Sequence, residues 1–310
     1  MTEESARTTA TPACYRHPDR ETSISCVRCE RPICPECMQS ASVGFQCPEC
    51  VREGRRTTPV ARTVFGGGPS GQRGTVTATL VWINVVVWLL TVAEAILVEK
   101  VPLQHIGRLV IYGDVTDVTR WGAAIPAYSC GSGGVCGIAG GEFWRLLTAD
   151  FLHYGIIHIG FNMYALWIIG RQCEQLLGRW RFLALYLLSG VGGSVAVYLF
   201  AAPGQESAGA SASIFGLLGA FFFFLRRLGA DPRGLVFLIV LNFGLTLVVP
   251  NISVWGHVGG FVVGAVVGAI LAYLPVGRGR GAPQIIALSG VGLALVVLVA
   301  LRTASYGLLF

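Results

Sequence analysis

The chain has 310 residues, of which 53% are hydrophobic and only 13% are charged, whereas a soluble domain usually carries roughly a quarter charged residues. This composition excludes an ordinary soluble enzyme. The charges are also uneven, because residues 1–73 hold ten Arg and eight acidic residues, and the other 237 residues hold only 22 charges. The sequence therefore predicts a small polar N-terminal region followed by a membrane-embedded body.

The net charge of +6 does not indicate a nucleic-acid partner, because the Arg residues are scattered between apolar runs and form no basic face. Composition divides the chain into five segments. We expect a disordered N-terminus at 1–13, a cysteine-rich domain at 14–50, a flexible Arg- and Gly-rich linker at 51–75, six transmembrane helices at 76–275, and a seventh helix with a tail at 276–310.

Eight metal-ligand residues occur in four pairs with two-residue gaps: Cys14 and His17, Cys26 and Cys29, Cys34 and Cys37, and Cys47 and Cys50. Such a gap lets one turn aim both ligands at one ion, and zinc with four Cys, or three Cys and one His, is the usual structural result. We predict two zinc ions with interleaved pairs, the first and third pairs on one ion and the second and fourth on the other. Reduced structural cysteines without metal are the alternative.

This arrangement resembles a B-box-type zinc finger, a small two-zinc module that serves in protein interaction, and so implies a cytosolic protein partner. The pattern leaves no open coordination position for catalysis. The first 60 residues contain no apolar core long enough for a cleavable signal peptide, so we expect the domain to stay in the cytosol.

Seven apolar runs of about 20 residues, the length that spans a bilayer, begin near residues 76, 150, 181, 210, 234, 253 and 284. Basic residues accumulate in cytoplasmic loops. Placing the N-terminus inside puts these cations on the cytoplasmic face: Arg171, Arg179, Arg181, Arg226, Arg227, Arg233, Arg278 and Arg280. The sequence thus predicts an all-α multi-pass protein of the cell membrane, a bacterial plasma membrane by preference. The loop at 100–145 would lie outside, where Cys130 and Cys136 are candidates for a disulfide.

Polar groups inside membrane helices are costly and mark candidate functional sites. His158 and Asn162 are four residues apart and share a helix face, and Ser211 starts a helix between small residues. His257 lies in a helix with glycine at every fourth position, 256 to 268, which lets a neighbouring backbone approach closely. At about 1.5 Å per residue, the serine and both histidines lie roughly 20 to 27 Å above the cytoplasmic boundary.

A serine hydroxyl needs a base within hydrogen-bond reach to become a nucleophile, and His257 is the candidate. The oxyanion would then need donors, for which Asn162, His158 and the Ser211 backbone N–H are suitable. No acidic residue lies in either helix to orient the histidine, so we expect a dyad. Each histidine alone could instead be a satisfied core side chain, and the glycine face could serve only packing. Ser213 is interpreted as a packing hydroxyl.

Several motifs together resemble the rhomboid intramembrane serine proteases over residues 76–275: Trp144-Arg145, His158-x3-Asn162, Gly170-x3-Glu174, Gly209-Ala210-Ser211 and His257-Val258-Gly259-Gly260. The resemblance implies a six-helix core, to which this chain adds a seventh helix. It also implies Ser211 as nucleophile, His257 as general base, His158 with Asn162 as the oxyanion group, and transmembrane proteins as substrates, with no metal needed for catalysis.

One position departs from the family pattern, because Ala212 follows the serine where the family usually has glycine. A methyl group there would narrow the site or move the Ser211 N–H. A catalytically impaired rhomboid-like protein that binds transmembrane helices is therefore the alternative. A transporter with a histidine proton relay fits less well, since no paired broken helices or membrane carboxylate cluster occurs.

Overall fold

The computed structural model describes residues 11–57, 62–68, 74–131, 134–249, 252–274 and 281–307. The chain divides into two compact units, with the boundary between Val60 and Ala61. Most of the segment expected to be disordered, 1–13, lies outside the described residues, as do Arg278 and Arg280 of the expected cytoplasmic loops.

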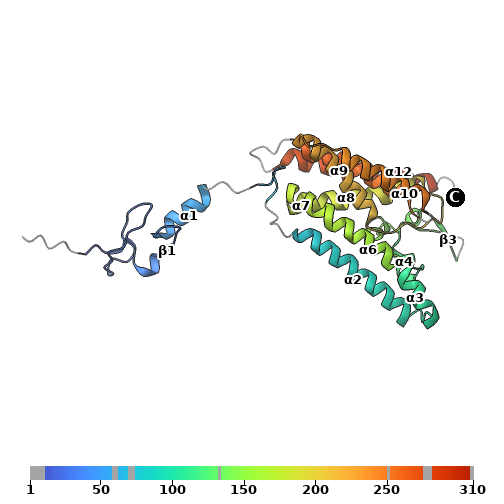
Figure 1. The fold of residues 1–310 in the computed structure, drawn as a ribbon, viewed down its shortest axis with the longest axis horizontal. Coiled ribbons are helices and arrows are strands. Elements are labelled where there is room, and N and C mark those ends of the chain that lie inside the picture. Colours follow the sequence, from blue (N-terminus) through green and yellow to red (C-terminus); the bar gives the residue numbers. More distant parts are fainter. Residues whose placement is uncertain are drawn as a thin grey trace, which may run out of the picture. The chain divides into compact units, whose positions relative to one another are not determined.

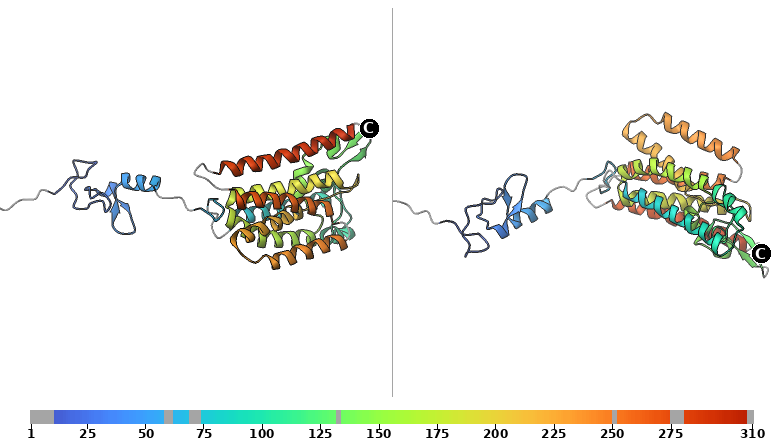
Figure 2. Two further views of the ribbon diagram at one scale, coloured as in Figure 1. Left: turned by 90° about the horizontal axis from the view of Figure 1, so that it is seen from above. Right: turned by 60° about the horizontal axis from the view of Figure 1, so that its bottom comes forward.

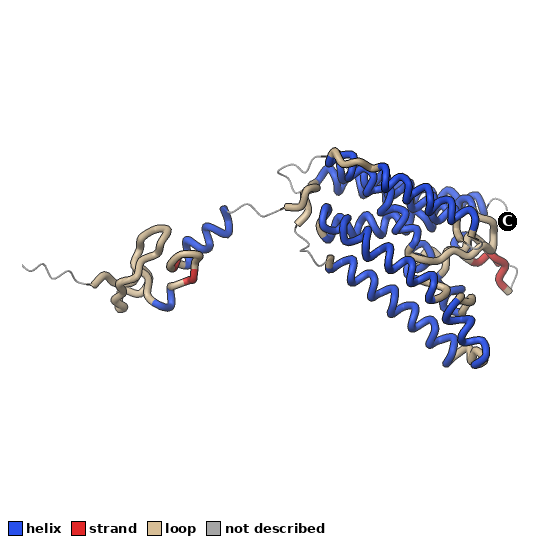
Figure 3. The backbone as a smooth tube through the Cα atoms, viewed as in Figure 1, coloured by secondary structure: helices blue, strands red, loops and turns tan. Residues whose placement is uncertain are grey.

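The N-terminal unit has little regular structure (Figure 3). It consists of a 3-10 turn, a two-stranded antiparallel ribbon and one helix: η1 Pro35–Cys37, β1 Gln39–Ser40, β2 Phe45–Gln46 and α1 Pro48–Thr57. Its interior is formed by Ile33 and cysteine side chains, six of the seven cysteines being fully buried. So small an apolar interior cannot stabilise 40 to 50 residues alone, and such domains generally depend on metal or disulfides.

The segment expected to be a flexible linker, 51–75, is ordered in part. Helix α1 continues through its first seven residues to Thr57. Further on, residues 63–68 form a tight turn against the membrane unit, in which the Phe65 N–H donates to the Leu176 carbonyl at 3.3 Å. The Phe65 ring is buried 4.9 Å from the ring of Phe224. An aromatic anchor among small residues accounts for this docking, since burial of its ring offsets the entropy of ordering the turn.

The second unit is a bundle of long helices (Figure 1), which confirms the all-α polytopic prediction. The long elements are α2 Thr75–Leu97, α6 Ile156–Ala165 continued by the π-helical turn η4 Leu166–Gly170 and by α7 Arg171–Leu177, α8 Arg179–Phe200, α9 Ser211–Leu228, α10 Arg233–Val248, α11 Val254–Tyr273 and α12 Ala282–Gly307. Among the described residues, five helices are long and apolar enough to cross a membrane, or six if the bent pair around residue 153 is counted as one span. Helix α10 is apolar but shorter.

Short elements fill the expected outer loop and gather at one end of the bundle (Figure 1). They are α3 Leu103–Ile111, α4 Asp117–Gly122, β3 Tyr128–Cys130, β4 Gly134–Cys136, η2 Ile138–Gly140, α5 Arg145–Thr148 and η3 Ala149–Phe151. Strands β3 and β4 pair antiparallel, and the Cys130–Cys136 disulfide joins them. The loop is therefore a folded cap that packs on the helices.

The second expected membrane helix begins later than its apolar run. Residues 152–155 are not helical, and the chain bends by 92° between the η3 end and α6. Gly155 lies directly against the backbone of the α3 end, where an added Cβ would be 2.6 Å from Gly113 N. The close approach of two backbones ends one helix and starts the next, which an apolar run in the sequence does not reveal.

Helices α8, α9 and α11 form the centre of the bundle. A Cβ added at Gly260, Gly264 or Gly268 of α11 would lie 2.1 to 2.4 Å from the backbone of α9, at its small residues Ala212, Gly216 and Ala220. The predicted glycine face is thus confirmed as the contact surface. Helix α12 runs along one side of the bundle (Figure 2) and contacts α8, where the Tyr198 and Thr303 hydroxyls are 2.9 Å apart.

Glu174, from the Gly170-x3-Glu174 motif, is fully buried and caps the N-terminus of α2. Its carboxylate accepts hydrogen bonds from the backbone N–H groups of Val76 and Thr77, at 3.0 and 2.8 Å, and from the Thr77 hydroxyl. These N–H groups have no partner within their own helix, and a negative charge is favourable at that end. The motif therefore joins two helices of the bundle.

Candidate active site and metal clusters

The candidate nucleophile Ser211 is the first residue of α9. The preceding Gly209 has φ of +132°, a backbone conformation that glycine adopts readily. A Cβ added there would lie 2.7 Å from His158 Nε2, so only glycine permits the imidazole to stand this close to the turn. The small residues of the Gly209-Ala210-Ser211 motif therefore bring α6 and the start of α9 together.

His257, in the first turn of α11, faces the serine. Its Nε2 lies 2.8 Å from Ser211 Oγ, within hydrogen-bond distance. The imidazole ring stacks on Phe215, with the ring centroids 4.1 Å apart and the planes at 15°. Ser253 caps α11 by accepting from the Gly256 N–H at 3.2 Å. The ring is therefore held in place by its helix, by the serine and by an aromatic face.

The second nitrogen of His257 has a partner that the sequence analysis missed. Nδ1 lies 2.7 Å from Oγ1 of Thr246, a buried residue near the end of α10. A signal for it existed, because Asn242 and Thr246 are the polar side chains of α10 beyond its first residue, and they share one helix face. A depth estimate of the kind made for the other helices, with Arg233 as the cytoplasmic end, puts Thr246 roughly 20 Å above the boundary, but it does not identify His257 as the partner.

His158 and Asn162 lie beside Gly209, two residues before the candidate nucleophile. The Asn162 side-chain amide donates to the His158 carbonyl at 3.1 Å, and a Cβ added at Gly209 would lie 3.7 Å from Asn162 Nδ2. The structure thus brings all four candidate catalytic residues to the start of α9. His153 caps the same turn, since its Nε2 accepts from the Ala210 N–H at 3.4 Å.

The Ala212 methyl group lies beside Gly193 of α8. A Cβ added at Gly193 of α8 would lie 2.5 Å from the Ala212 Cβ, which shows that the methyl group occupies the space that Gly193 leaves open. The methyl group therefore packs between α9 and α8. Whether the methyl group also narrows the site or shifts the Ser211 N–H stays a prediction from the sequence.

A buried carboxyl group lies behind the site but does not reach the histidine. Asp150 Oδ2 accepts a hydrogen bond from the Ser213 hydroxyl at 2.8 Å, and Ser213 also lies 2.7 Å from the Tyr186 carbonyl. These contacts tie the η3 segment to α8 and α9, as expected of a packing hydroxyl at Ser213. Within the described part of the chain, Asp150 makes no hydrogen bond to His257, whose two ring nitrogens face Thr246 and Ser211.

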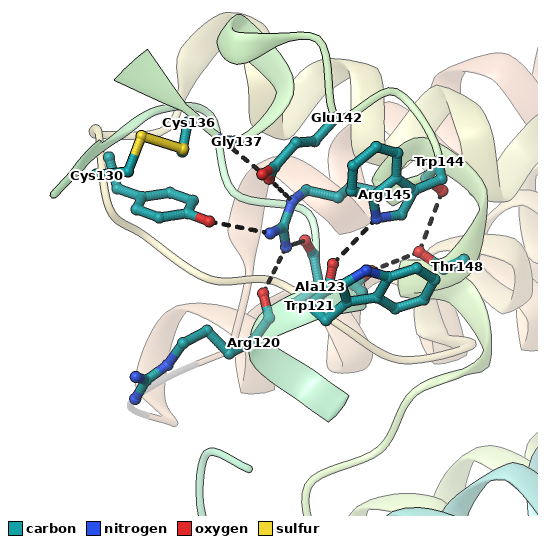
Figure 4. A network of polar contacts seen from close by, with 12 residues as sticks. Arg120, Trp121, Ala123, Cys130, Cys136, Gly137, Glu142, Trp144, Arg145 and Thr148 are labelled. Atoms are coloured by element: carbon teal, nitrogen blue, oxygen red, sulfur yellow. Dashed lines mark hydrogen bonds and ion pairs between the residues drawn. A yellow bond between two sulfur atoms is a disulfide. The ribbon is translucent and has the colours of Figure 1, made fainter. Parts of the chain in front are cut away.

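The Trp144-Arg145 motif organises the folded cap (Figure 4). Arg145 is only 1% exposed, and its guanidinium donates to the carbonyls of Arg120 and Ala123 at 2.6 and 2.9 Å and pairs with Glu142 at 2.5 Å. The indole of Trp144 stacks on Trp121 with centroids 5.7 Å apart. One arginine therefore links α4, the β3–β4 region and α5, immediately before the segment that carries the histidines.

The eight ligand residues of the N-terminal unit form two clusters with the predicted interleaving. Cys14, His17, Cys34 and Cys37 make one, and Cys26, Cys29, Cys47 and Cys50 the other; within each, the ligand atoms lie within 4.8 Å of one another. His17 Nδ1 is 3.8, 3.2 and 3.5 Å from the three sulfur atoms of its cluster. A tetrahedral zinc site holds sulfur and nitrogen ligands about 3.5 Å apart, so the donor set fits such an ion.

Backbone hydrogen bonds favour the thiolate form of one ligand in each cluster. Burial raises the pKa of the Cys14 thiol, but donation from backbone N–H groups, including that of Arg16, outweighs burial and lowers the pKa to about 6. The pKa of Cys26 is lowered to about 6 in the same way, the Cys47 N–H lying 3.2 Å from its sulfur. Burial and neighbouring thiols raise the pKa of Cys37 to about 11. The three sulfur ligands of that cluster would repel one another as thiolates unless a cation lay among them.

Comparison with known proteins connects this geometry to a family. Residues 140–274 match the model of the Rhomboid domain. The chain is 42% identical over 142 residues to "Rhomboid protease GluP" of Bacillus subtilis, a match that covers 43% of this chain and 27% of that protein. It is 30% identical over 155 residues to "Putative rhomboid protease YdcA" of the same organism, covering 47% of this chain and 75% of that protein.

A plant relative, "RHOMBOID-like protein 4" of Arabidopsis thaliana, is 37% identical over 145 residues, which cover 44% of this chain and 36% of the plant protein. The match therefore spans only about a quarter to a third of the length of GluP and of this plant protein. The two Cys/His clusters, the Phe65 turn and α12 all lie outside the matched domain.

Proposed function

Because this chain belongs to the rhomboid family, we propose that it is an intramembrane serine endopeptidase with Ser211 as nucleophile and His257 as general base. The observation that carries the proposal is the 2.8 Å distance between Ser211 Oγ and His257 Nε2 at the start of two tightly packed helices. Its substrates are membrane proteins cleaved in or near a transmembrane segment.

In the proposed reaction, Ser211 Oγ attacks the carbonyl carbon of the scissile bond, and its proton moves to His257 Nε2. The electron pair of the carbonyl bond moves to oxygen, and the N-terminus of α9 with Asn162 and His158 supplies donors to this oxyanion. His257 then gives its proton to the leaving amine as the C–N bond breaks. A water molecule, deprotonated by His257, hydrolyses the acyl-enzyme and restores the serine.

The test is cleavage of a single-span reporter protein by the purified full-length chain in liposomes. We expect the Ser211→Ala and His257→Ala variants to be slower by at least about 10³-fold in kcat, while their thermal unfolding stays close to that of the wild type. Equal cleavage by wild type and both variants would contradict the proposal.

The alternative, a helix-binding protein without catalysis, was suggested by Ala212. The packing of its methyl group against Gly193 accounts for Ala212 as a helix contact, so the alanine by itself does not favour the alternative. Binding of the reporter without cleavage would favour the alternative.

For the N-terminal unit we propose two structural zinc ions, one in each cluster. The support is the spacing of the ligand atoms and the scarcity of other stabilising interior in this unit. All eight ligand positions are filled by protein side chains, so the ions would stabilise the fold and leave no position for a substrate. A module of this kind would present its surface to a cytosolic protein partner.

We further propose that the chain is a multi-pass protein of the cell membrane with its N-terminus in the cytoplasm. Arginines at the starts of α7, α8 and α10 and at the end of α9 support this orientation under the positive-inside rule: Arg171, Arg179, Arg181, Arg226, Arg227 and Arg233. The disulfide in the cap is compatible with an oxidising exterior. Accessibility of single engineered cysteines to an impermeant thiol reagent in intact cells tests the orientation.

A further inference from the structure

Thr246 is an unusual residue for its helix. Helix α10 is largely exposed in the structure, and Leu235 and Thr246 are its two buried side chains. The Thr246 hydroxyl has two neighbours, the Asn242 carbonyl oxygen at 2.9 Å and His257 Nδ1 at 2.7 Å. A buried polar contact between an otherwise loosely packed helix and the candidate base requires an explanation.

The number of protons decides how these contacts are arranged. A threonine hydroxyl has one proton to donate and can accept as well. The Asn242 carbonyl can only accept, so the hydroxyl proton points to it and the hydroxyl oxygen accepts from His257 Nδ1–H. The reverse arrangement would leave the carbonyl oxygen at 2.9 Å without a proton and lose that hydrogen bond.

This arrangement fixes the state of the imidazole. A neutral histidine carries one N–H, and which nitrogen bears it is set by the hydrogen bond of the other. With the proton on Nδ1, the Nε2 lone pair faces Ser211 Oγ at 2.8 Å and can take its proton. The bonds then run in one direction, from Ser211 to His257 to Thr246 and on to the Asn242 carbonyl, and such chains strengthen each member.

We propose that Thr246 is a positioning residue that holds His257 in the Nδ1–H tautomer, ready to accept the serine proton. This inference rests on the proposed protease function. Thr246 takes the place that a carboxylate fills in a serine triad, but as a neutral dipole. It orients the base without supplying a full negative charge to the imidazolium. The expected effect of its loss is therefore smaller than the loss of an acidic triad member.

The test compares three variants in liposomes. Thr246→Val keeps the shape but removes the hydroxyl, and we expect kcat to fall about 10- to 100-fold with KM little changed. Thr246→Ser keeps the hydroxyl and should restore most of the rate. Thr91→Val is the matched control. Thr91 is a buried threonine of α2 whose hydroxyl also donates to the carbonyl four residues earlier, Val87 O at 2.9 Å. The kcat of this variant should equal that of the wild type.

A second measurement does not depend on catalysis. The 15N chemical shifts of His257, labelled in the full-length protein, report which ring nitrogen carries the proton. We expect a protonated Nδ1 in the wild type and in Ser211→Ala, and a mixture of tautomers in Thr246→Val.

Two results would overturn the inference even if the wild type cleaves its reporter: a kcat of Thr246→Val equal to that of Thr91→Val, or a wild-type His257 protonated on Nε2. An equal loss of rate in Thr246→Val and Thr246→Ser would also overturn it, since it would assign the effect to packing. If the wild type does not cleave at all, the protease proposal fails, and the NMR shifts still decide the tautomer.

Discussion

In the N-terminal unit, ligands that share a cluster come in pairs with two residues between them, and the turn that these residues form sets the geometry of the pair. In the membrane unit, Ser211 and His257 are 46 residues apart and meet only because α9 and α11 pack closely. Metal bound in the N-terminal clusters would stabilise the fold of that unit, whereas the Ser211–His257 pair depends on helix packing that does not need the pair. Removing a site should therefore have opposite consequences in the two units.

The largest effect is expected from metal removal. Structural zinc contributes apparent binding free energies of about 10 to 16 kcal/mol, so a chelator, or Cys47→Ser in one cluster, should unfold residues 14–57. Elemental analysis should find about two zinc ions per wild-type chain and fewer in the variant. Limited proteolysis should then cut the N-terminal unit while the thermal unfolding of the helix bundle stays unchanged.

The matched control for this experiment is Cys173→Ser, since Cys173 is buried in the helix bundle and belongs to neither cluster. Its zinc content should equal that of the wild type. A metal-free wild-type chain whose N-terminal unit resists protease would remove the zinc proposal.

The next effect concerns the cap. Arg145→Ala removes a buried guanidinium and leaves Glu142 and two backbone carbonyls without their donor, which should cost about 3 to 5 kcal/mol in the free energy of unfolding. Arg120→Ala is the control, because the Arg120 side chain is exposed and points away from the network (Figure 4). Thermal unfolding in detergent measures both, and equal stability of the two variants would show that the network does not hold the cap.

A smaller effect on the free energy of unfolding is expected from Gly→Ala substitutions, and its sign should differ between a packed and an exposed glycine. Gly264→Ala places a Cβ 2.2 Å from Gly216 Cα, and such overpacking typically costs about 1 to 3 kcal/mol; it should also separate Ser211 from His257 and slow cleavage. Gly290→Ala on α12 meets no atom within 4 Å and should stabilise the helix by up to about 1 kcal/mol. If Gly264→Ala and Gly290→Ala changed the free energy of unfolding and kcat by the same amounts, the account of the α11 glycine face would be contradicted.

The smallest effect is expected at Ala212. Since its methyl group packs against Gly193, Ala212→Gly should leave kcat within about 3-fold of the wild type and lower stability by about 1 kcal/mol. A large rise in reporter cleavage would mean that Ala212 does restrain the enzyme.

These contrasts also explain what the sequence could predict. The cluster ligands and their interleaving follow from short spacings, and the candidate dyad follows from motifs and depth along straight helices. Three features depend on tertiary contacts that no local pattern encodes: the bend before α6, set by the approach of Gly155 to the α3 end, the docking of Phe65 against Phe224, and the Thr246–His257 contact. The hydroxyl of Thr246 was visible in the sequence, but its partner was not.

The central claim, that Ser211 is activated by His257, is tested most directly with a fluorophosphonate probe on the folded full-length protein. We predict a covalent adduct that mass spectrometry maps to Ser211 in the wild type and in Ser213→Ala, with no adduct in Ser211→Ala and a strongly reduced labelling rate in His257→Ala. An adduct on Ser213, or labelling of Ser211 at the same rate without His257, would contradict it.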